Sequence, residues 1–89
     1  MIILKLKMTN KNGLHARPSA LVANTAREFE SKIIFAHGKQ RADAASILQL
    51  LALYASYNTT VILYIHGPDE IKAAAAMQNL FDTKFKDAY

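Results

Sequence analysis

The chain has 89 residues, of which 52% are hydrophobic and 20% charged, a composition that supports the core of one small domain and excludes a long disordered chain. The absence of cysteine excludes disulfide bonds and thiol chemistry. Eleven Lys and Arg against seven Asp and Glu give a net charge of +4, which favours acidic partners such as nucleic acid, acidic protein surfaces or phosphorylated groups.

No segment of the chain has the composition of a membrane span or a secretory signal. The apolar run from Ile47 to Ala55 is interrupted by Gln49 and is far shorter than the ~20 residues that a spanning helix needs. The N-terminus alternates apolar residues with Lys5 and Lys7, unlike the continuous apolar region of a signal peptide. We therefore expect a cytoplasmic protein without a membrane contact, in which residues 1–89 form one domain.

The first half of the chain predicts one strand, one helix and a strand pair. Residues 2–8 alternate between apolar and polar side chains, as in a strand with one buried face. After a polar loop, the apolar period becomes helical over residues 16–28, and Pro18 suits the first turn of that helix. Two short strands, residues 32–36 and 40–44, flank a turn at Gly38.

The second half predicts a short helix, a strand and a final helix. Ser46 precedes an apolar run and is a favoured N-cap, so the short helix begins there. Residues 59–66 are rich in β-branched residues, as in a strand. A turn at residues 67–69 then opens the last helix, where Glu70 suits the first turn. Its apolar residues at helical spacing are Ala74, Met77, Phe81 and Phe85, with Lys84 and Lys86 near its end.

The order of these elements is β-α-β-β-α-β-α. The middle strands are too close in sequence for a parallel crossover. The pattern therefore predicts an α+β fold: a four-stranded, mainly antiparallel sheet with three helices on one face.

The segment from Gly13 to Pro18, Gly-Leu-His-Ala-Arg-Pro, carries the chemistry. It places His15 at the start of a helix, where unpaired backbone N–H groups and the helix dipole attract anions. A neutral imidazole is a nucleophile at physiological pH, and Arg17 can donate to phosphate oxygens through its planar guanidinium. These parts together predict a histidine that accepts a phosphoryl group. The simpler interpretation of a single histidine here is a cap or a solvated side chain.

The same segment, extended to Ser19, resembles the active-site signature of HPr, the histidine phosphocarrier family of the bacterial sugar phosphotransferase system. The resemblance covers nearly the whole chain, including Gly38-Lys39, Ser46-Ile47 and residues 67–70. It implies the open-faced β-sandwich of that family. It also implies a monomeric carrier that needs no cofactor or metal and is not itself an enzyme.

The resemblance also implies partners. His15 would accept phosphate, on Nδ1, from enzyme I, which phosphoenolpyruvate charges, and would pass it to IIA domains of sugar permeases. Arg17 would stabilise the phosphoryl group, and the backbone amides of Ala16 and Arg17 would face it. Ser46 falls where the family has a regulatory serine, which implies a serine kinase and a transcriptional regulator in catabolite control. A plain N-cap is the alternative for Ser46.

The second helix of the family carries a docking patch, and here its candidates are Ile47, Leu48 and Leu51. An exposed apolar cluster of this kind suits a transient interface. Because one face of so apolar a run must be buried, we assign Leu50 and Leu53 to the core.

The sequence departs from the family around this helix. Ala45 replaces a common lysine, and Tyr54 and Asn58 stand near positions that are usually glycine. Asn58 tolerates a left-handed turn, whereas Tyr54 suggests a different helix end or a longer helix. These changes leave the histidine chemistry intact and concern regulation and partner identity.

Three other interpretations remain. A paralogue in a nitrogen-regulatory or specialised branch would explain the atypical second helix. A small basic module that binds nucleic acid would show salt-dependent binding, although Tyr64 and Phe35 lack the aromatic strand signature of an RNA-recognition motif. A metal site is disfavoured because His15, His37 and His66 are not at ligand spacing.

Overall fold

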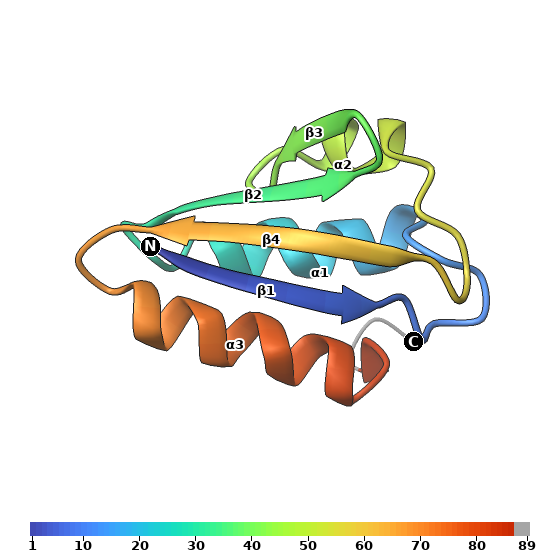
Figure 1. Ribbon diagram of the computed structural model, residues 1–89. Helices are drawn as coiled ribbons and strands as arrows, with labels where there is room; N and C mark the ends of the chain where they lie inside the picture. The colour runs from blue at the N-terminus through green and yellow to red at the C-terminus, as the bar shows by residue number, and fades with distance from the viewer. Residues whose placement is uncertain (87–89) are drawn as a thin grey trace.

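A computed structural model of the chain describes residues 1–86 (Figure 1). The α+β fold and the order β-α-β-β-α-β-α are confirmed. Met8, Ala44 and Thr59 lie just outside the strands predicted to include them. The elements are β1 (Ile2–Lys7), α1 (Ala16–Ala26), β2 (Lys32–His37), β3 (Gln40–Asp43), α2 (Ile47–Ala52), β4 (Thr60–His66) and α3 (Glu70–Asp82).

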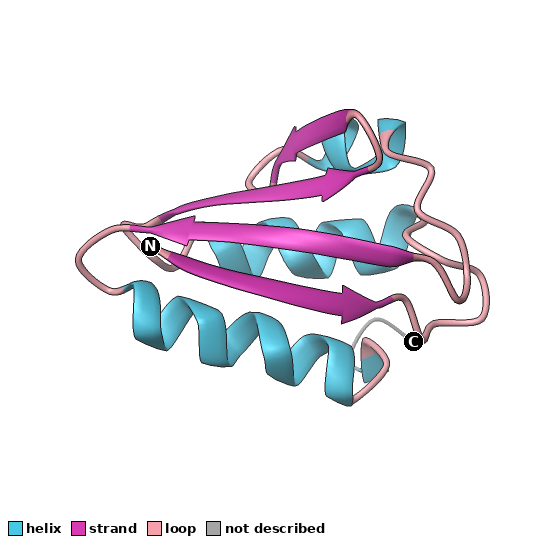
Figure 2. Ribbon diagram, in the orientation of Figure 1, coloured by secondary structure: helices cyan, strands magenta, loops and turns pink. Residues whose placement is uncertain are grey.

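The four strands form one sheet in the order β1-β4-β2-β3, and every neighbouring pair is antiparallel (Figure 2). The last strand in the sequence therefore lies between the first two. Lys7 at the end of β1 pairs with Thr60 at the start of β4. The loop after β1 and the loop before β4 consequently leave the sheet at the same end, where the candidate site lies.

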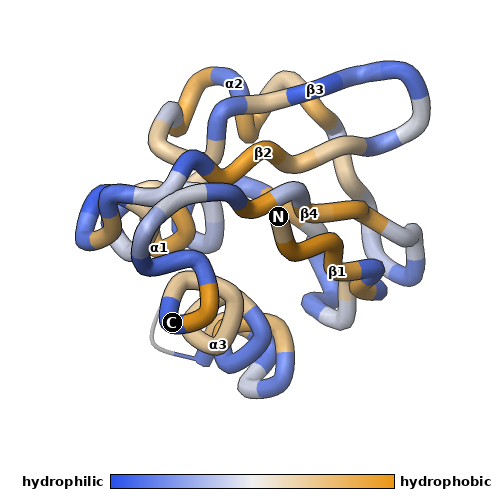
Figure 3. Tube along the Cα trace, turned by 60° about the vertical axis from the view of Figure 1, so that its left-hand side comes forward, coloured by the Kyte–Doolittle hydropathy of each residue, from blue (hydrophilic) through white to orange (hydrophobic). Residues whose placement is uncertain are grey.

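The core lies between one face of the sheet and the three helices. Alternate residues of the middle strands point into it, and apolar residues are concentrated in β1, β2 and β4 (Figure 3). The large buried strand residues are Ile33, Phe35, Val61, Leu63 and Ile65, and the small ones are Ala36 and Ala42. From the helices, Val22, Leu50 and Met77 are fully buried against them. No helix within residues 1–86 is long and apolar enough to cross a membrane.

Two helices are shorter than their sequence patterns predict. The first ends at Ala26 and gives way to tighter turns, in which Glu28 N–H donates to Thr25 O. The last ends at Asp82, because Lys84 and Phe85 both have positive φ angles. Lys84 and Lys86 therefore lie beyond the helix and not in its final turn.

Phe85 is buried although α3 ends before it, and its helical spacing from Phe81 had predicted this burial. Phe85 N–H donates to Leu80 O at 2.8 Å, which is the wide hydrogen bond of a Schellman-type helix end. The chain then turns Phe85 back into the core, where its ring meets Phe81 edge-on at 4.9 Å between centroids. The spacing thus predicted the burial correctly but not the backbone that achieves it.

Asp69 joins the start of α3 to the loop before β2. One carboxylate oxygen accepts from the backbone N–H and hydroxyl of Ser31, and the other accepts from Glu30 N–H at 3.0 Å. Gly67 allows this approach, because a Cβ there would lie 2.5 Å from the Cα of Ser31. The Asp69 side chain makes no capping bond to its own helix.

Acidification should weaken the hydrogen bonds that Asp69 accepts from Glu30 and Ser31. The hydrogen bond from the Ser31 hydroxyl, followed by that from Glu30 N–H, holds the pKa of Asp69 below its usual value. Its contribution to stability is therefore complete above the unfolded pKa of about 4 and is lost as pH falls through the lower native pKa. Urea unfolding between about pH 6 and about pH 3 should show a shallower loss of stability for Asp69→Asn than for the wild type.

Asp82→Asn is the matched control, because among residues 1–86 that exposed carboxylate accepts a bond only from the exposed Gln78 side chain. It should retain the wild-type pH profile. Identical profiles for Asp69→Asn and the wild type would contradict the assignment.

Candidate functional site

His15 is the N-cap of α1, as the sequence predicted. Its backbone is extended, with φ −95° and ψ −165°, and its carbonyl accepts from Ser19 N–H at 2.9 Å. The half-buried side chain makes no capping hydrogen bond to the helix. The imidazole therefore stands at the positive end of the helix without occupying the amides of its first turn.

The first turn of α1 offers donors beside this imidazole. Ala16 and Arg17 are exposed, and their N–H groups precede the residues that find acceptors inside the helix. Pro18 has no N–H, and Ser19 N–H is already bonded, so the amides of Ala16 and Arg17 are the donors that this turn could offer to an anion. Within residues 1–86, no hydrogen bond or ion pair engages the guanidinium of Arg17, which lies on the same turn.

Gly13 fixes the loop that delivers His15. Its φ is +70°, and a Cβ at this position would lie 2.5 Å from Ala55 O and 2.8 Å from the Cα of Ser56. Leu14 N–H donates to the same Ala55 oxygen at 2.8 Å, and the Asn10 side-chain amide donates to Gly13 O at 2.7 Å. These contacts hold the start of α1 against the segment that follows α2.

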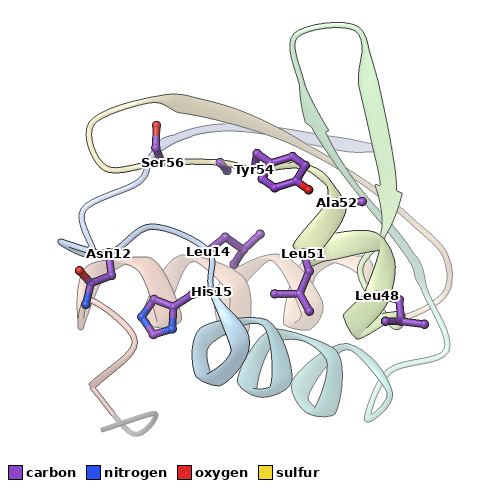
Figure 4. A pocket seen from close by; sticks show the side chains of 9 residues that line it. Asn12, Leu14, His15, Leu48, Leu51, Ala52, Tyr54 and Ser56 are labelled. Atoms are coloured by element: carbon purple, nitrogen blue, oxygen red, sulfur yellow. The ribbon is translucent and has the colours of Figure 1, made fainter.

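Between these segments lies an open depression of about 560 Å³ (Figure 4). His15 stands at one end of it, and Leu48 and Leu51 on α2 lie toward the other. None of the lining residues carries a formal charge when the histidine is neutral. They are Asn12, Leu14, His15, Leu48, Leu51, Ala52, Tyr54, Ala55 and Ser56.

Helix α2 separates the residues expected in the core from those expected to dock. Leu50 and Leu53 are buried, which confirms their assignment to the core. Leu48 is 80% exposed and Leu51 is half-buried, and both line the depression. Ile47 differs from them, because it packs against the core and does not line the depression.

Ser46 caps α2, as the sequence predicted. Its hydroxyl accepts from Gln49 N–H at 3.3 Å, and the Gln49 side chain accepts in turn from Asp43 N–H at 2.8 Å. The preceding residue, Ala45, presents its carbonyl to the guanidinium of Arg27 at 2.9 Å. Ser46 does not line the depression that contains His15.

Of the two alternatives predicted from Tyr54, a different helix end or a longer helix, the longer helix is wrong. The helix ends at Ala52 with Leu53 as its C-cap, and Tyr54 itself takes a left-handed conformation with φ 51°. Asn58 is also left-handed, with φ 72°, as its side chain allows. The chain therefore retains the turns for which glycine is suited, although it has no glycine at either position.

The other histidines lie at the ends of strands, as expected, and neither lines the depression beside His15. His37 Nδ1 is 3.0 Å from Leu53 O, and His66 lies 3.7 Å from the Glu70 carboxylate. Within residues 1–86, no three metal-ligating side chains come together.

Asn12, Tyr54 and Ser56 were not predicted as neighbours of His15, although all three line the same depression. Tyr54 and Ser56 are about forty residues away along the chain. No local spacing could place these two beside His15, since their position depends on the contact between Gly13 and Ala55.

Comparison with known proteins identifies relatives over the whole length of the chain. Residues 4–83 match the family model PTS-HPr, described as the PTS HPr component phosphorylation site. The chain is 36% identical to the phosphocarrier protein HPr of Treponema pallidum over 98% of this chain and 99% of that protein. It is 38% identical to the phosphocarrier protein NPr of Shewanella violacea, over 94% and 92% respectively.

A solved structure gives the same result for the fold. HPr-C-His from Thermoanaerobacter tengcongensis superposes with a TM-score of 0.92 at 36% identity and covers 97% of both chains.

Replacing Gly13 with alanine should destabilise the protein more than the same change at Gly38. Both glycines have positive φ, so both variants bear a left-handed alanine, at a cost of about 1–2 kcal/mol. Only the Gly13 variant also places a methyl group against backbone atoms, because nothing lies within 4 Å of a Cβ at Gly38. Urea unfolding of both variants should therefore give the lower stability for Gly13→Ala, and equal losses would contradict the close approach.

Proposed function

The chain belongs to the HPr family of phosphocarriers of the phosphotransferase system, and from this we propose that it carries its phosphoryl group on His15. The observation that supports His15 is its position as the N-cap of α1, with an imidazole that leaves the first-turn amides unoccupied. A phosphocarrier is consumed and regenerated in a relay and does not turn over a small molecule.

Phosphoryl transfer to His15 would exchange one bond to phosphorus for another. The bond that joins the phosphorus to enzyme I breaks as the lone pair of an imidazole nitrogen of His15 forms the new bond to phosphorus. The phosphoryl oxygens then lie near the amides of Ala16 and Arg17 and the guanidinium of Arg17, all of which favour negative charge. The reverse exchange passes the group to a IIA domain and restores the imidazole.

The carrier would meet these partners as a monomer, through the apolar surface beside His15. Leu48 and Leu51 support this, because they are accessible and line the same depression as the imidazole. Ile47 would act from beneath the surface by supporting α2, since it packs against the core.

We further propose that Ser46 is a regulatory phosphorylation site for a serine kinase, with a transcriptional regulator as reader. Family membership and the position of the hydroxyl at the start of α2 support this proposal. A phosphate there would add negative charge near Leu48 and would weaken an apolar docking surface. Mass-spectrometric location of phosphate on Ser46 in cells is the direct check.

A nitrogen-regulatory branch is the second candidate. The 38% identity to an NPr protein supports it, beside the 36% identity to an HPr protein. Rates of phosphate transfer from the enzyme I protein of each branch would decide between them.

His15→Ala should abolish acid-labile labelling by enzyme I and radiolabelled phosphoenolpyruvate, because the variant has no acceptor nitrogen at the site. Its fold should remain intact, because His15 is not among the buried core residues. His66→Ala is the control, because that side chain is 72% exposed and lies at the end of β4. Label retained by His15→Ala would refute the assignment.

Arg17→Ala should slow phosphate transfer by about tenfold to a hundredfold without abolishing it, because a hydrogen bond to a charged group contributes about 1.5–3 kcal/mol. Single-turnover transfer measures this rate. Arg41→Ala on β3 removes an equal charge elsewhere and should transfer at the wild-type rate. Equal rates for both variants would remove Arg17 from the site.

A further inference from the structure

Tyr54 combines an unfavourable backbone conformation, an exposed side chain and a position beside His15. It has a φ of 51°, its side chain is 82% exposed, and it lines the depression that contains His15. In the view of Figure 4 its ring lies above Leu14 and Leu51. Leu48, which is 80% exposed, borders the same depression.

The left-handed conformation is unfavourable for tyrosine, because Cβ approaches the following carbonyl oxygen. Glycine would adopt it without that clash. A ring that is 82% exposed gains little from burial, so packing within the chain does not offset the unfavourable backbone. A strained residue kept at the surface points to a contact outside the free protein.

The location of Tyr54 identifies that contact, given the function proposed for His15. Direct transfer requires the donor's phosphorus to come within bonding distance of the imidazole, so the donor's surface must cover the residues around His15. Tyr54 lies within this footprint, beside Leu48 and Leu51. Because the depression is lined by no Lys, Arg, Asp or Glu side chain, the matching surface of the donor should be apolar.

We propose that Tyr54 is a partner-contact residue whose ring packs against an apolar face of phosphorylated enzyme I. This inference rests on the function proposed for His15. Tyrosine suits the role, because it provides a large and rigid contact area and is enriched among residues that dominate binding energy. The residue is thus retained for recognition at the expense of stability in the free chain.

The test compares Tyr54→Gly with Tyr54→Phe and with Asn58→Gly. Tyr54→Gly removes both the ring and the unfavourable backbone, whereas Tyr54→Phe retains the ring. Asn58→Gly relaxes a second left-handed residue, with φ 72°, that does not line the depression. Each variant is measured by urea unfolding and by steady-state phosphorylation with enzyme I and phosphoenolpyruvate.

For Tyr54→Gly we expect a higher urea midpoint together with a KM for the carrier raised about tenfold, which corresponds to about 1.4 kcal/mol. The kcat should be unchanged, because His15 and the first turn of α1 are intact. Tyr54→Phe and Asn58→Gly should keep the wild-type KM.

Two results would overturn the inference in distinguishable ways. A wild-type KM for Tyr54→Gly, with wild-type protein labelled on His15, would refute the role of Tyr54 alone. Absence of label on wild-type protein, with an enzyme I that labels its own HPr, would refute both the function proposed for His15 and the contact that rests on it.

Discussion

The close approach of Gly13 to Ala55 is the constraint on which the site depends. It brings together two segments about forty residues apart and leaves no room for a Cβ between them. The hydrogen bond from Leu14 N–H to Ala55 O then fixes the direction in which the chain enters α1. Because the helix begins immediately afterwards, its N-terminus and His15 fall beside the end of α2. An isolated helix start thereby becomes one end of a surface depression.

The sheet topology makes this approach available. Lys7 and Thr60 pair at one end of the sheet, and Met8 and Asn58 extend that pairing by a further backbone hydrogen bond. The chain leaving β1 and the chain entering β4 are therefore side by side before either reaches the site. The antiparallel insertion of β4 beside β1 thus positions the segment that carries His15, although no strand residue lines the depression.

Sequence predicted the features that depend on neighbours along the chain. The N-cap position of His15, the cap at Ser46 and the buried residues Leu50 and Leu53 follow from spacing and local hydrogen bonding. Two features were missed. The left-handed Tyr54 is one, since tyrosine does not favour that conformation, and the bond between Asp69 and Ser31, which joins distant segments, is the other. Neither leaves a periodic pattern in the sequence.

The structure divides the proposed site into two parts under different constraints. Phosphate chemistry requires one imidazole, the first-turn amides and a cation, all within a few residues of the start of α1. The proposed docking surface consists of exposed side chains of α2 and the following turn, where Leu48 and Tyr54 project, and Ala45 just before α2 departs from the family pattern. A substitution in this second part should change which partner surface fits the carrier, without moving the imidazole nitrogen of His15. The choice of phosphotransfer branch should therefore lie in α2 and its C-terminal turn, and an exchange of residues 45–54 between relatives should transfer partner preference while leaving His15 as the acceptor.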